Sequence, residues 1–148
     1  MRFWDASALV PLFLIEQSTP AMLQLRQDDA DIIAWWGSRV ECSSVIARLV
    51  REGRLGEAPA SQAHVDLMAL WEAVAEISPV EEVRSRAEAC LQAHPLRAAD
   101  SLQLGASLIW SADQPGGRVF VSLDLRLREA ARNEGFVVLP DTMPSQAT

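Results

Sequence analysis

The 148-residue chain contains no lysine, and all 13 of its basic residues are arginine. A phosphate-binding loop of the G-x-x-x-x-G-K-[ST] type needs its lysine, so this class of nucleotide-binding protein is excluded. Catalysis through a lysine Schiff base is excluded for the same reason. Any enzymatic chemistry must therefore come from other side chains.

Cysteine and histidine are also scarce, with two of each in the chain. Cys42 and Cys90 lie in apolar helical patterns, and their spacing to His64 and His94 is not that of a metal site. We expect both cysteines to be reduced residues of the hydrophobic core. A zinc site is not expected.

Long apolar runs are missing as well. None reaches the roughly 18 residues of a membrane span, and the N-terminus lacks the basic region, apolar stretch and cleavage site of a secretory signal. We therefore expect a cytoplasmic protein without membrane contacts.

The formal net charge is −7 and the pI is about 4.8. This balance argues against nonspecific nucleic-acid binding through a global basic surface, although it leaves room for a local site. The length and the 49% hydrophobic composition suit one globular domain. We expect residues 1–140 to form it and residues 141–148 to be a disordered tail.

Short apolar runs alternate with helical patterns along the chain. The runs expected to form strands are 2–5, 32–34, 119–121 and 136–139. The helices expected around them begin at Ser7 and cover 18–26, 38–53, 59–74, 80–92, 94–110 and 125–133. Because the strands are almost continuously apolar, the pattern predicts a parallel sheet of four or five short strands covered on both faces, in a three-layer α/β/α fold.

Two aspartates stand just after predicted strands and before predicted helices. Asp5 interrupts the otherwise apolar stretch FWDASALVPLFLIE, and Asp124 follows the strand VFVS. Taken alone, Asp5 is better explained as a polar junction residue or local cap, and Asp124 is explained at least as well as a helix N-cap, which stabilises a helix by about 1 kcal/mol. In a parallel sheet, however, both would meet at the carboxyl edge, where α/β folds keep their binding sites.

Two further carboxylates occupy unusual positions on helices. Glu41 flanks the apolar face of its helix, and a boundary residue with its head in water is the better explanation when it is taken alone. Asp100 is the only ionisable residue between Ala98 and Ala112. That segment is apolar around its circumference and should be largely buried, where a lone aspartate would be costly. The alternative is a position near a helix N-terminus, which favours an anion by less than about 1 kcal/mol.

The four acids together suggest more than capping. Two carboxylates about 4 Å apart repel by roughly 4 kcal/mol at an effective dielectric constant of about 20, and a cap cannot offset several such pairs. If the four converge, either raised, coupled pKa values keep some protonated or a divalent cation neutralises them. Ligation by oxygen alone suits Mg²⁺ or Mn²⁺.

Four segments resemble, in order and separation, the motifs of PIN-domain ribonucleases, and most closely those of the VapC toxins of bacterial toxin–antitoxin pairs. The resemblance covers about residues 1–140. The matching segments are FWDASALVPLFLIE with Asp5 and Ser7, VECSSVIARL with Glu41, LRAADSLQLGASL with Asp100, and FVSLDLRLREAARNEGF with Ser122 and Asp124.

The resemblance implies a three-layer α/β/α fold, Mg²⁺- or Mn²⁺-dependent endoribonuclease activity, frequent homodimerisation and inhibition by a small VapB-like antitoxin that blocks the acidic site. It assigns metal binding and activation of water to Asp5, Asp100 and Asp124. Glu41 would hold metal directly or through water. Ser7 and Ser122 would orient the carboxylates, although helix capping and strand-end solvation explain these serines equally well.

Two features could help such an enzyme approach RNA. The helix around Glu41 carries more arginine than glutamate, with a local charge of +2 from Arg39, Arg48, Arg51 and Arg54 against Glu41 and Glu52. A solvated helix surface is the simpler explanation for any one of them. Trp35 and Trp36 could stack on bases or form a protein interface, but hydrophobic packing is their default role, and we assign them no site.

Several alternatives stay open. The fold could serve RNA processing outside a toxin system, or it could be a catalytically inactive PIN-like module that binds a protein partner. Haloacid-dehalogenase-like phosphatases and response-regulator receivers also place acids at strand ends, but both depend on a lysine that this chain lacks.

Overall fold

Five parallel strands form a single sheet in the order β3-β2-β1-β4-β5. The computed structural model describes residues 1–144. Its strands are β1 (Arg2–Trp4), β2 (Ile32–Trp35), β3 (Val74–Ile77), β4 (Val119–Val121) and β5 (Val137–Leu139). The predicted parallel sheet is confirmed.

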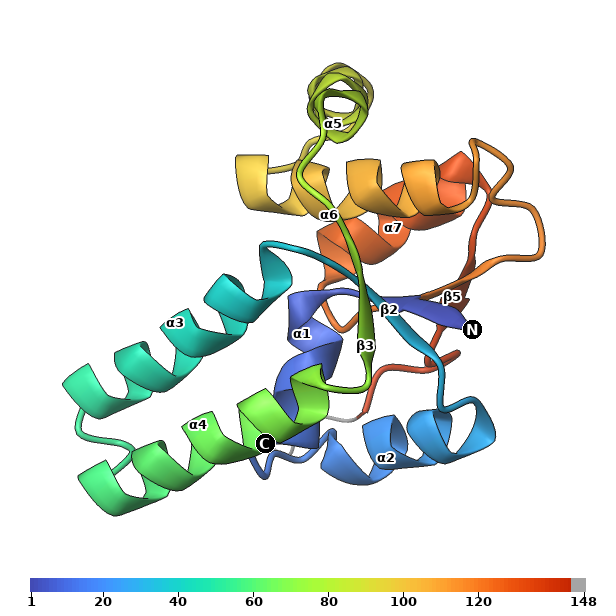
Figure 1. Cartoon of the computed structure of the whole chain (residues 1–148). Coiled ribbons are helices and arrows are strands. Elements are labelled where there is room, and N and C mark those ends of the chain that lie inside the picture. Colours follow the sequence, from blue (N-terminus) through green and yellow to red (C-terminus); the bar gives the residue numbers. More distant parts are fainter. Residues whose placement is uncertain (145–148) are drawn as a thin grey trace.

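Helices cover both faces of the sheet (Figure 1). On one side lie α1 (Ala6–Leu9), the 3₁₀ turn η1 (Val10–Leu12), α2 (Thr19–Asp28), α3 (Ser38–Arg51) and α4 (Glu57–Trp71). On the other side lie α5 (Glu81–Ala93), α6 (Ala98–Trp110) and α7 (Leu125–Glu134). The predicted three-layer α/β/α fold is confirmed.

The two faces of the sheet bury separate cores because successive side chains of a strand point in opposite directions. Trp4 packs on the α1–α4 side, whereas its neighbour Phe3 packs on the α5–α7 side, where it stacks on Phe120 at 5.2 Å between ring centroids. Cys42 and Cys90 are both free and buried, one in each core, as expected.

The chain reverses its direction of winding between β1 and β4. From β1 it proceeds outward through β2 to β3, then returns to add β4 on the other side of β1. In open α/β sheets, ligands bind outside the carboxyl ends of the two strands that flank this switch. Here those ends are occupied by the residues after Trp4 and after Val121.

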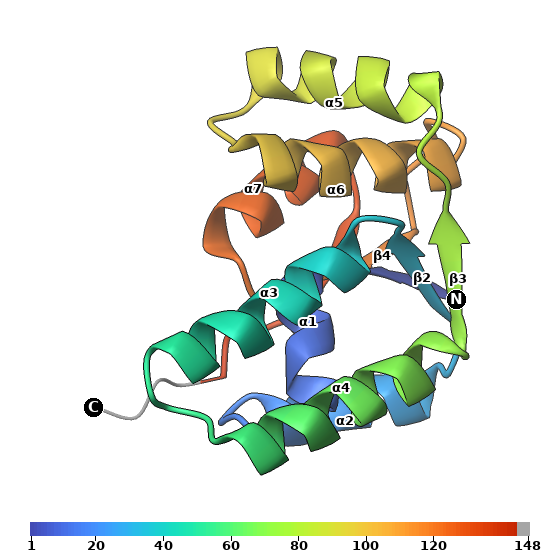
Figure 2. The ribbon, with the colours of Figure 1, turned by 60° about the vertical axis from the view of Figure 1, so that its left-hand side comes forward.

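Helices α5 and α6 pack unusually closely. A Cβ atom at Gly105 of α6 would lie 2.9 Å from the backbone nitrogen of Ala87 and 3.0 Å from the backbone oxygen of Val83, both in α5. The glycine therefore permits this close approach of two backbones. Figure 2 shows α5 running along α6 over most of its length.

Two predicted boundaries are wrong. The helix expected over 59–74 ends at Trp71, and the strand β3 follows it. This strand lies at the edge of the sheet and is largely exposed, so it does not read as an apolar run. The helix expected from His94 begins at Ala98 instead, since His94 precedes a proline and adopts an extended conformation.

Within residues 1–144, no helix is long and apolar enough to cross a membrane. The chain continues without regular structure after β5 as far as Pro144. The rest of the predicted disordered tail, residues 145–148, lies outside the described residues.

Candidate active site

Asp5 lies directly at the carboxyl end of β1, and it is only 4% exposed. Its backbone nitrogen donates to the carbonyl of Val121, the last residue of β4, at 3.1 Å. Its side chain caps α1, accepting from the backbone nitrogen of Ala8 at 3.3 Å. The hydroxyl of Ser7 lies 2.7 and 3.0 Å from the two carboxylate oxygens, so Ser7 orients this carboxylate as predicted.

Asp124 lies beyond the carboxyl end of the neighbouring strand β4, where it caps α7. Its Oδ1 accepts from the backbone nitrogen of Leu127 at 2.9 Å. The backbone nitrogen of Asp124 itself donates to Ser122 Oγ at 3.1 Å. The two junctions are linked, because the backbone nitrogen of Leu123 donates to Ser7 Oγ at 2.9 Å. Both predicted caps therefore exist, and they stand side by side at the switch point.

Glu41 and Asp100 approach this edge from helices on opposite faces of the sheet. Glu41 lies in the first turn of α3, where its Oε1 accepts from Gln103 Nε2 at 2.9 Å. Gln103 is buried in α6 and also donates to Ser38 Oγ at 2.8 Å. Asp100 lies in the first turn of α6, and its Oδ2 accepts from the backbone nitrogen of Arg97 at 3.4 Å.

The four carboxylates act on one another electrostatically. Burial raises the pKa of Asp5 to about 7, despite hydrogen bonds from Ser7 and Ala8 that lower it; the negative charges of Glu41 and Asp124 raise it further. Burial and the charge of Asp100 raise the pKa of Glu41, opposed by the hydrogen bond from Gln103.

The pKa of Asp100 is raised by burial and by the charge of Asp124, and it is lowered by its bond to the Arg97 backbone and by the positive charges of Arg97 and Arg126. The charges of Glu41 and Asp124 thus act on Asp5, that of Asp100 acts on Glu41, and that of Asp124 acts on Asp100. The structure therefore brings all four predicted residues to one region. Because the pKa values of Asp5, Glu41 and Asp100 are raised, holding these three ionised costs free energy.

The donor set suits a hard divalent cation, but the side chains do not enclose one. Carboxylate oxygens are the ligands that Mg²⁺ and Mn²⁺ prefer, and a cation would offset both the burial of these charges and their mutual repulsion, which together raise the pKa values. In the part of the chain that the structure describes, no three acidic, histidine or cysteine side chains surround a common point at which an ion could be held. The residues fit Mg²⁺ or Mn²⁺ in chemistry and charge, and ligation requires the side chains to close in.

Arg128 supports the site from behind and was not predicted. This α7 side chain is only 2% exposed, and its guanidinium donates to the carbonyl of Ser122 at 2.7 Å. It also donates to the carbonyls of Leu139 at 3.1 Å and Pro140 at 2.6 Å. Arg128 thereby joins the ends of β4 and β5. Its burial could not be predicted from the sequence, because the helix that carries it is rich in charged residues.

An open pocket of about 530 Å³ lies between the first turns of α6 and α7. Asp100 and Asp124 line it together with two arginines, Arg97 and Arg126. We did not single out these arginines from the sequence, although each stands within three residues of an acid. The arginines noted in the sequence around Glu41 do not line this pocket. One of them, Arg54, follows α3 and pairs with Glu52 at 3.3 Å.

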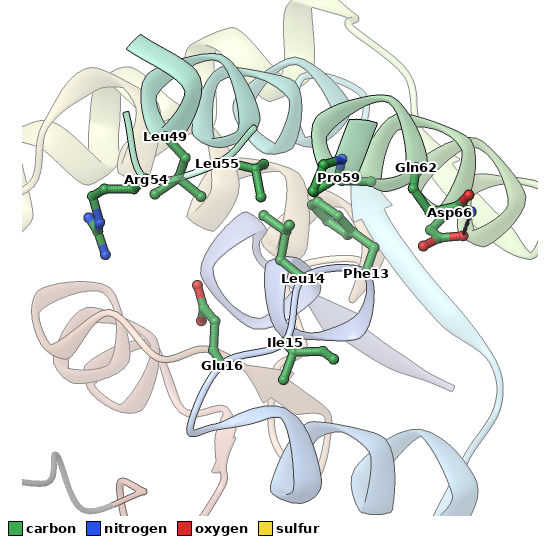
Figure 3. Close-up of a pocket in the computed structure, with 11 residues that line it drawn as sticks. Phe13, Leu14, Ile15, Glu16, Leu49, Arg54, Leu55, Pro59, Gln62 and Asp66 are labelled. Atoms are coloured by element: carbon green, nitrogen blue, oxygen red, sulfur yellow. Dashed lines mark hydrogen bonds between the residues drawn. The ribbon is translucent and has the colours of Figure 1, made fainter. Parts of the chain in front are cut away.

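A second pocket lies apart from the acids, between the chain after η1 and the α3–α4 hairpin (Figure 3). Its walls are largely apolar, with Leu14 and Leu55 approaching each other across it. None of the four acids lines it.

Trp35 is buried in the core on the α5–α7 side, whereas Trp36 is 50% exposed.

Comparison with known proteins supports the fold. No family model matches the chain. No curated protein matches it either. Among solved structures, the chain is similar to PAE2754 from Pyrobaculum aerophilum, with a TM-score of 0.60 and 19% identity over 93% of this chain and 88% of that one. At this identity the likeness supports the α/β/α architecture and carries no information on activity.

Proposed function

We propose that the chain is a Mg²⁺- or Mn²⁺-dependent endoribonuclease of the PIN-domain type, which hydrolyses RNA phosphodiester bonds. The observation that carries the proposal is the gathering of four carboxylates, Asp5, Glu41, Asp100 and Asp124, at the carboxyl edge of the sheet, beside the switch between β1 and β4. Bonds at helix N-termini explain Asp5, Asp100 and Asp124 one by one, but they do not explain why charges of these acids and of Glu41 act on one another.

The proposed roles follow from the hydrogen bonds. Asp5 would ligate the ion with an orientation fixed by Ser7, and Glu41 with one fixed by Gln103. Asp124 would do so from the N-cap of α7, with its backbone held by Ser122. A bound divalent ion would supply an activated water and stabilise charge on the phosphate. Fixed second partners of this kind reduce the rearrangement that ligation requires.

We further propose that the protein is the toxin of a VapBC-type pair, acting in the cytoplasm as a homodimer and inhibited by a VapB-like antitoxin. This part depends on the sequence resemblance of the four acidic segments alone. Co-expression tests it: a small protein encoded beside this chain should bind it and relieve growth arrest. If such a neighbour does neither, the toxin proposal fails while the nuclease proposal stands.

Metal-dependent cleavage tests the nuclease proposal directly. Purified protein is incubated with a panel of structured RNAs and Mn²⁺ or Mg²⁺, with and without chelator. The Asp5→Asn variant should lose cleavage, whereas Asp31→Asn, a matched change at an exposed aspartate before β2, should retain it. Cleavage that survives both chelation and the Asp5 substitution would reject the site.

One observation favours a second candidate, a PIN-like module that binds protein without catalysis. Within residues 1–144 the acidic side chains do not converge on a single ion-sized point. Binding of a partner or of RNA without cleavage of any RNA in the panel would support this alternative.

A further inference from the structure

We infer that the pocket between the first turns of α6 and α7 binds a phosphodiester of the RNA backbone through the guanidinium groups of Arg97 and Arg126. The inference builds on the proposed nuclease function and assigns these two arginines as substrate-positioning residues. According to this inference, the pocket recognises the backbone of the nucleic acid.

The lining of the pocket places positive and negative groups together. Arg97 and Asp100 come from the start of α6, and Asp124 and Arg126 come from the start of α7. Both arginines lie close enough to Asp100 for their charges to act on its carboxylate. The two guanidinium groups offset the charges of the two acids, so the pocket does not confront a phosphate with uncompensated negative charge.

Neither arginine is committed to another partner in an ion pair. Among the described residues, the ion pairs of arginine involve Arg2, Arg54, Arg84 and Arg86, but not these two. Arg118 lies over the ring of Trp110, and Arg128 is bound to backbone carbonyls. The side chains of Arg97 and Arg126 are exposed at the pocket, so their planar donor groups can bind a phosphate in a bidentate manner.

The backbone adds to this preference for an anion. Helices α6 and α7 have 13 and 10 residues, and both direct their N-terminal turns at the pocket. Asp100 and Asp124 each accept one backbone N–H at these ends, and the partial positive charge and remaining N–H groups of a helix N-terminus favour phosphate. Two such termini converge here on the same 530 Å³ space as the two arginines. The helices lie next to each other in both views (Figures 1 and 2).

The same lining argues against recognition of bases at this point. The remaining described residues of the pocket are Ala99, Leu123, Leu125 and Met143, and none of the lining side chains is aromatic. Stacking on aromatic rings and hydrogen bonds to base edges are the usual means of reading single-stranded RNA. Contacts to phosphate, in contrast, position the strand without regard to sequence. Each of the two arginines should therefore contribute the same binding free energy whatever the sequence of the RNA.

RNA binding measured over a salt series tests the inference. Fluorescently labelled single-stranded RNAs of three unrelated sequences are titrated with the full chain in chelator, and binding is followed by anisotropy. Arg97→Gln and Arg126→Gln should each weaken binding about tenfold, as expected for loss of a charge-assisted hydrogen bond. Each should also reduce the slope of log K against log salt by about 0.7, equally for all sequences. Arg132→Gln, a matched change at the far end of α7, should leave affinity and slope unchanged.

The outcomes separate this inference from the nuclease proposal. If both glutamine variants bind with the affinity and salt slope of the unmodified chain, the phosphate site is wrong, even if RNA is still cleaved with metal. If the unmodified chain binds none of the RNAs, the inference is also overturned. If binding depends on the two arginines but no metal supports cleavage, the phosphate site stands and the nuclease proposal fails. Circular dichroism of each variant verifies that it is folded.

Discussion

Replacing Asp5 with asparagine should stabilise the protein above pH 7 when divalent ions are removed, although it should abolish cleavage. Asparagine is nearly the same size as aspartate, and its carbonyl oxygen can accept the capping bond from Ala8. The substitution therefore removes the buried charge while leaving the packing in place.

The magnitude follows from the pKa of Asp5. Burial and neighbouring acids raise the pKa from 3.8 to about 7. Each pKa unit corresponds to about 1.4 kcal/mol, so keeping Asp5 ionised in the folded protein costs about 4 kcal/mol. Because the raised pKa belongs to an acid, the folded state holds the proton more tightly than the unfolded state. The contribution of protonated Asp5 to the free energy of unfolding is therefore fully present below about pH 4. It is lost as the pH rises to about 7 and changes little above that.

Urea denaturation from pH 4.5 to 8.5, with chelator present, provides the measurement. The free energy of unfolding of the unmodified chain should fall across this range, and that of Asp5→Asn should fall less by about 3 kcal/mol, because part of the effect is already lost at pH 4.5. Asp31→Asn serves as the matched control, because Asp31 is exposed and should follow the unmodified chain. Saturating Mg²⁺ or Mn²⁺ should restore stability to the unmodified chain much more than to Asp5→Asn, since ligands that bind the folded state stabilise it.

Two results would refute this reasoning. If the free energies of unfolding of the unmodified chain and of Asp5→Asn depend on pH in the same way, the pKa of Asp5 is not raised in the folded protein. Equal stabilisation of both proteins by the ion would mean that Asp5 is not among its ligands.

Two further changes test the supports of the site and of the fold. Gln103→Leu removes the hydrogen bond that holds the Glu41 carboxylate and lowers its pKa. Cleavage should therefore fall at least tenfold, and the acidic limb of the pH–rate profile should move to higher pH as the pKa of Glu41 rises. An unmoved acidic limb would contradict this role of Gln103. Gly105→Ala should lower the free energy of unfolding by roughly 1–3 kcal/mol, because the added Cβ meets the backbone of α5 at 2.9 Å and must push the helices apart. A higher melting temperature would show that helix propensity outweighs this contact.

The positions of Asp5 and Asp124 could be predicted from the sequence because both depend on local rules. An apolar run followed by an acid and a helical pattern marks the end of a strand, and parallel strands present their ends at the same edge. The edge strand β3 was missed because its side chains are mostly exposed, so the helix before it seemed to continue. Hydrophobic periodicity identifies a strand through its buried side chains, and an edge strand has few of them.

The side chains that support the acids could not be predicted in the same way. Gln103 meets Glu41 across 62 positions of sequence, and Arg128 reaches the carbonyl ends of two strands from the buried side of its helix. Neither partnership follows from the spacing of residues within an element. Arg97 and Arg126 are adjacent to motif acids, but only the packing of α6 beside α7 brings them to one pocket.

Capping and metal binding, which the sequence presented as alternatives for Asp5 and Asp124, are compatible in this structure. Leu127 donates to a single oxygen of Asp124, and a carboxylate has about four acceptor positions on its two oxygens. The cap bond restricts the side chain to one orientation at the sheet edge, and similar bonds from Ala8 and Ser7 restrict Asp5. Since each cap stabilises its helix by about 1 kcal/mol, far less than the cost of ionising Asp5, capping alone does not account for an acid at that position. Under the proposed function, capping would align these carboxylates for a divalent cation.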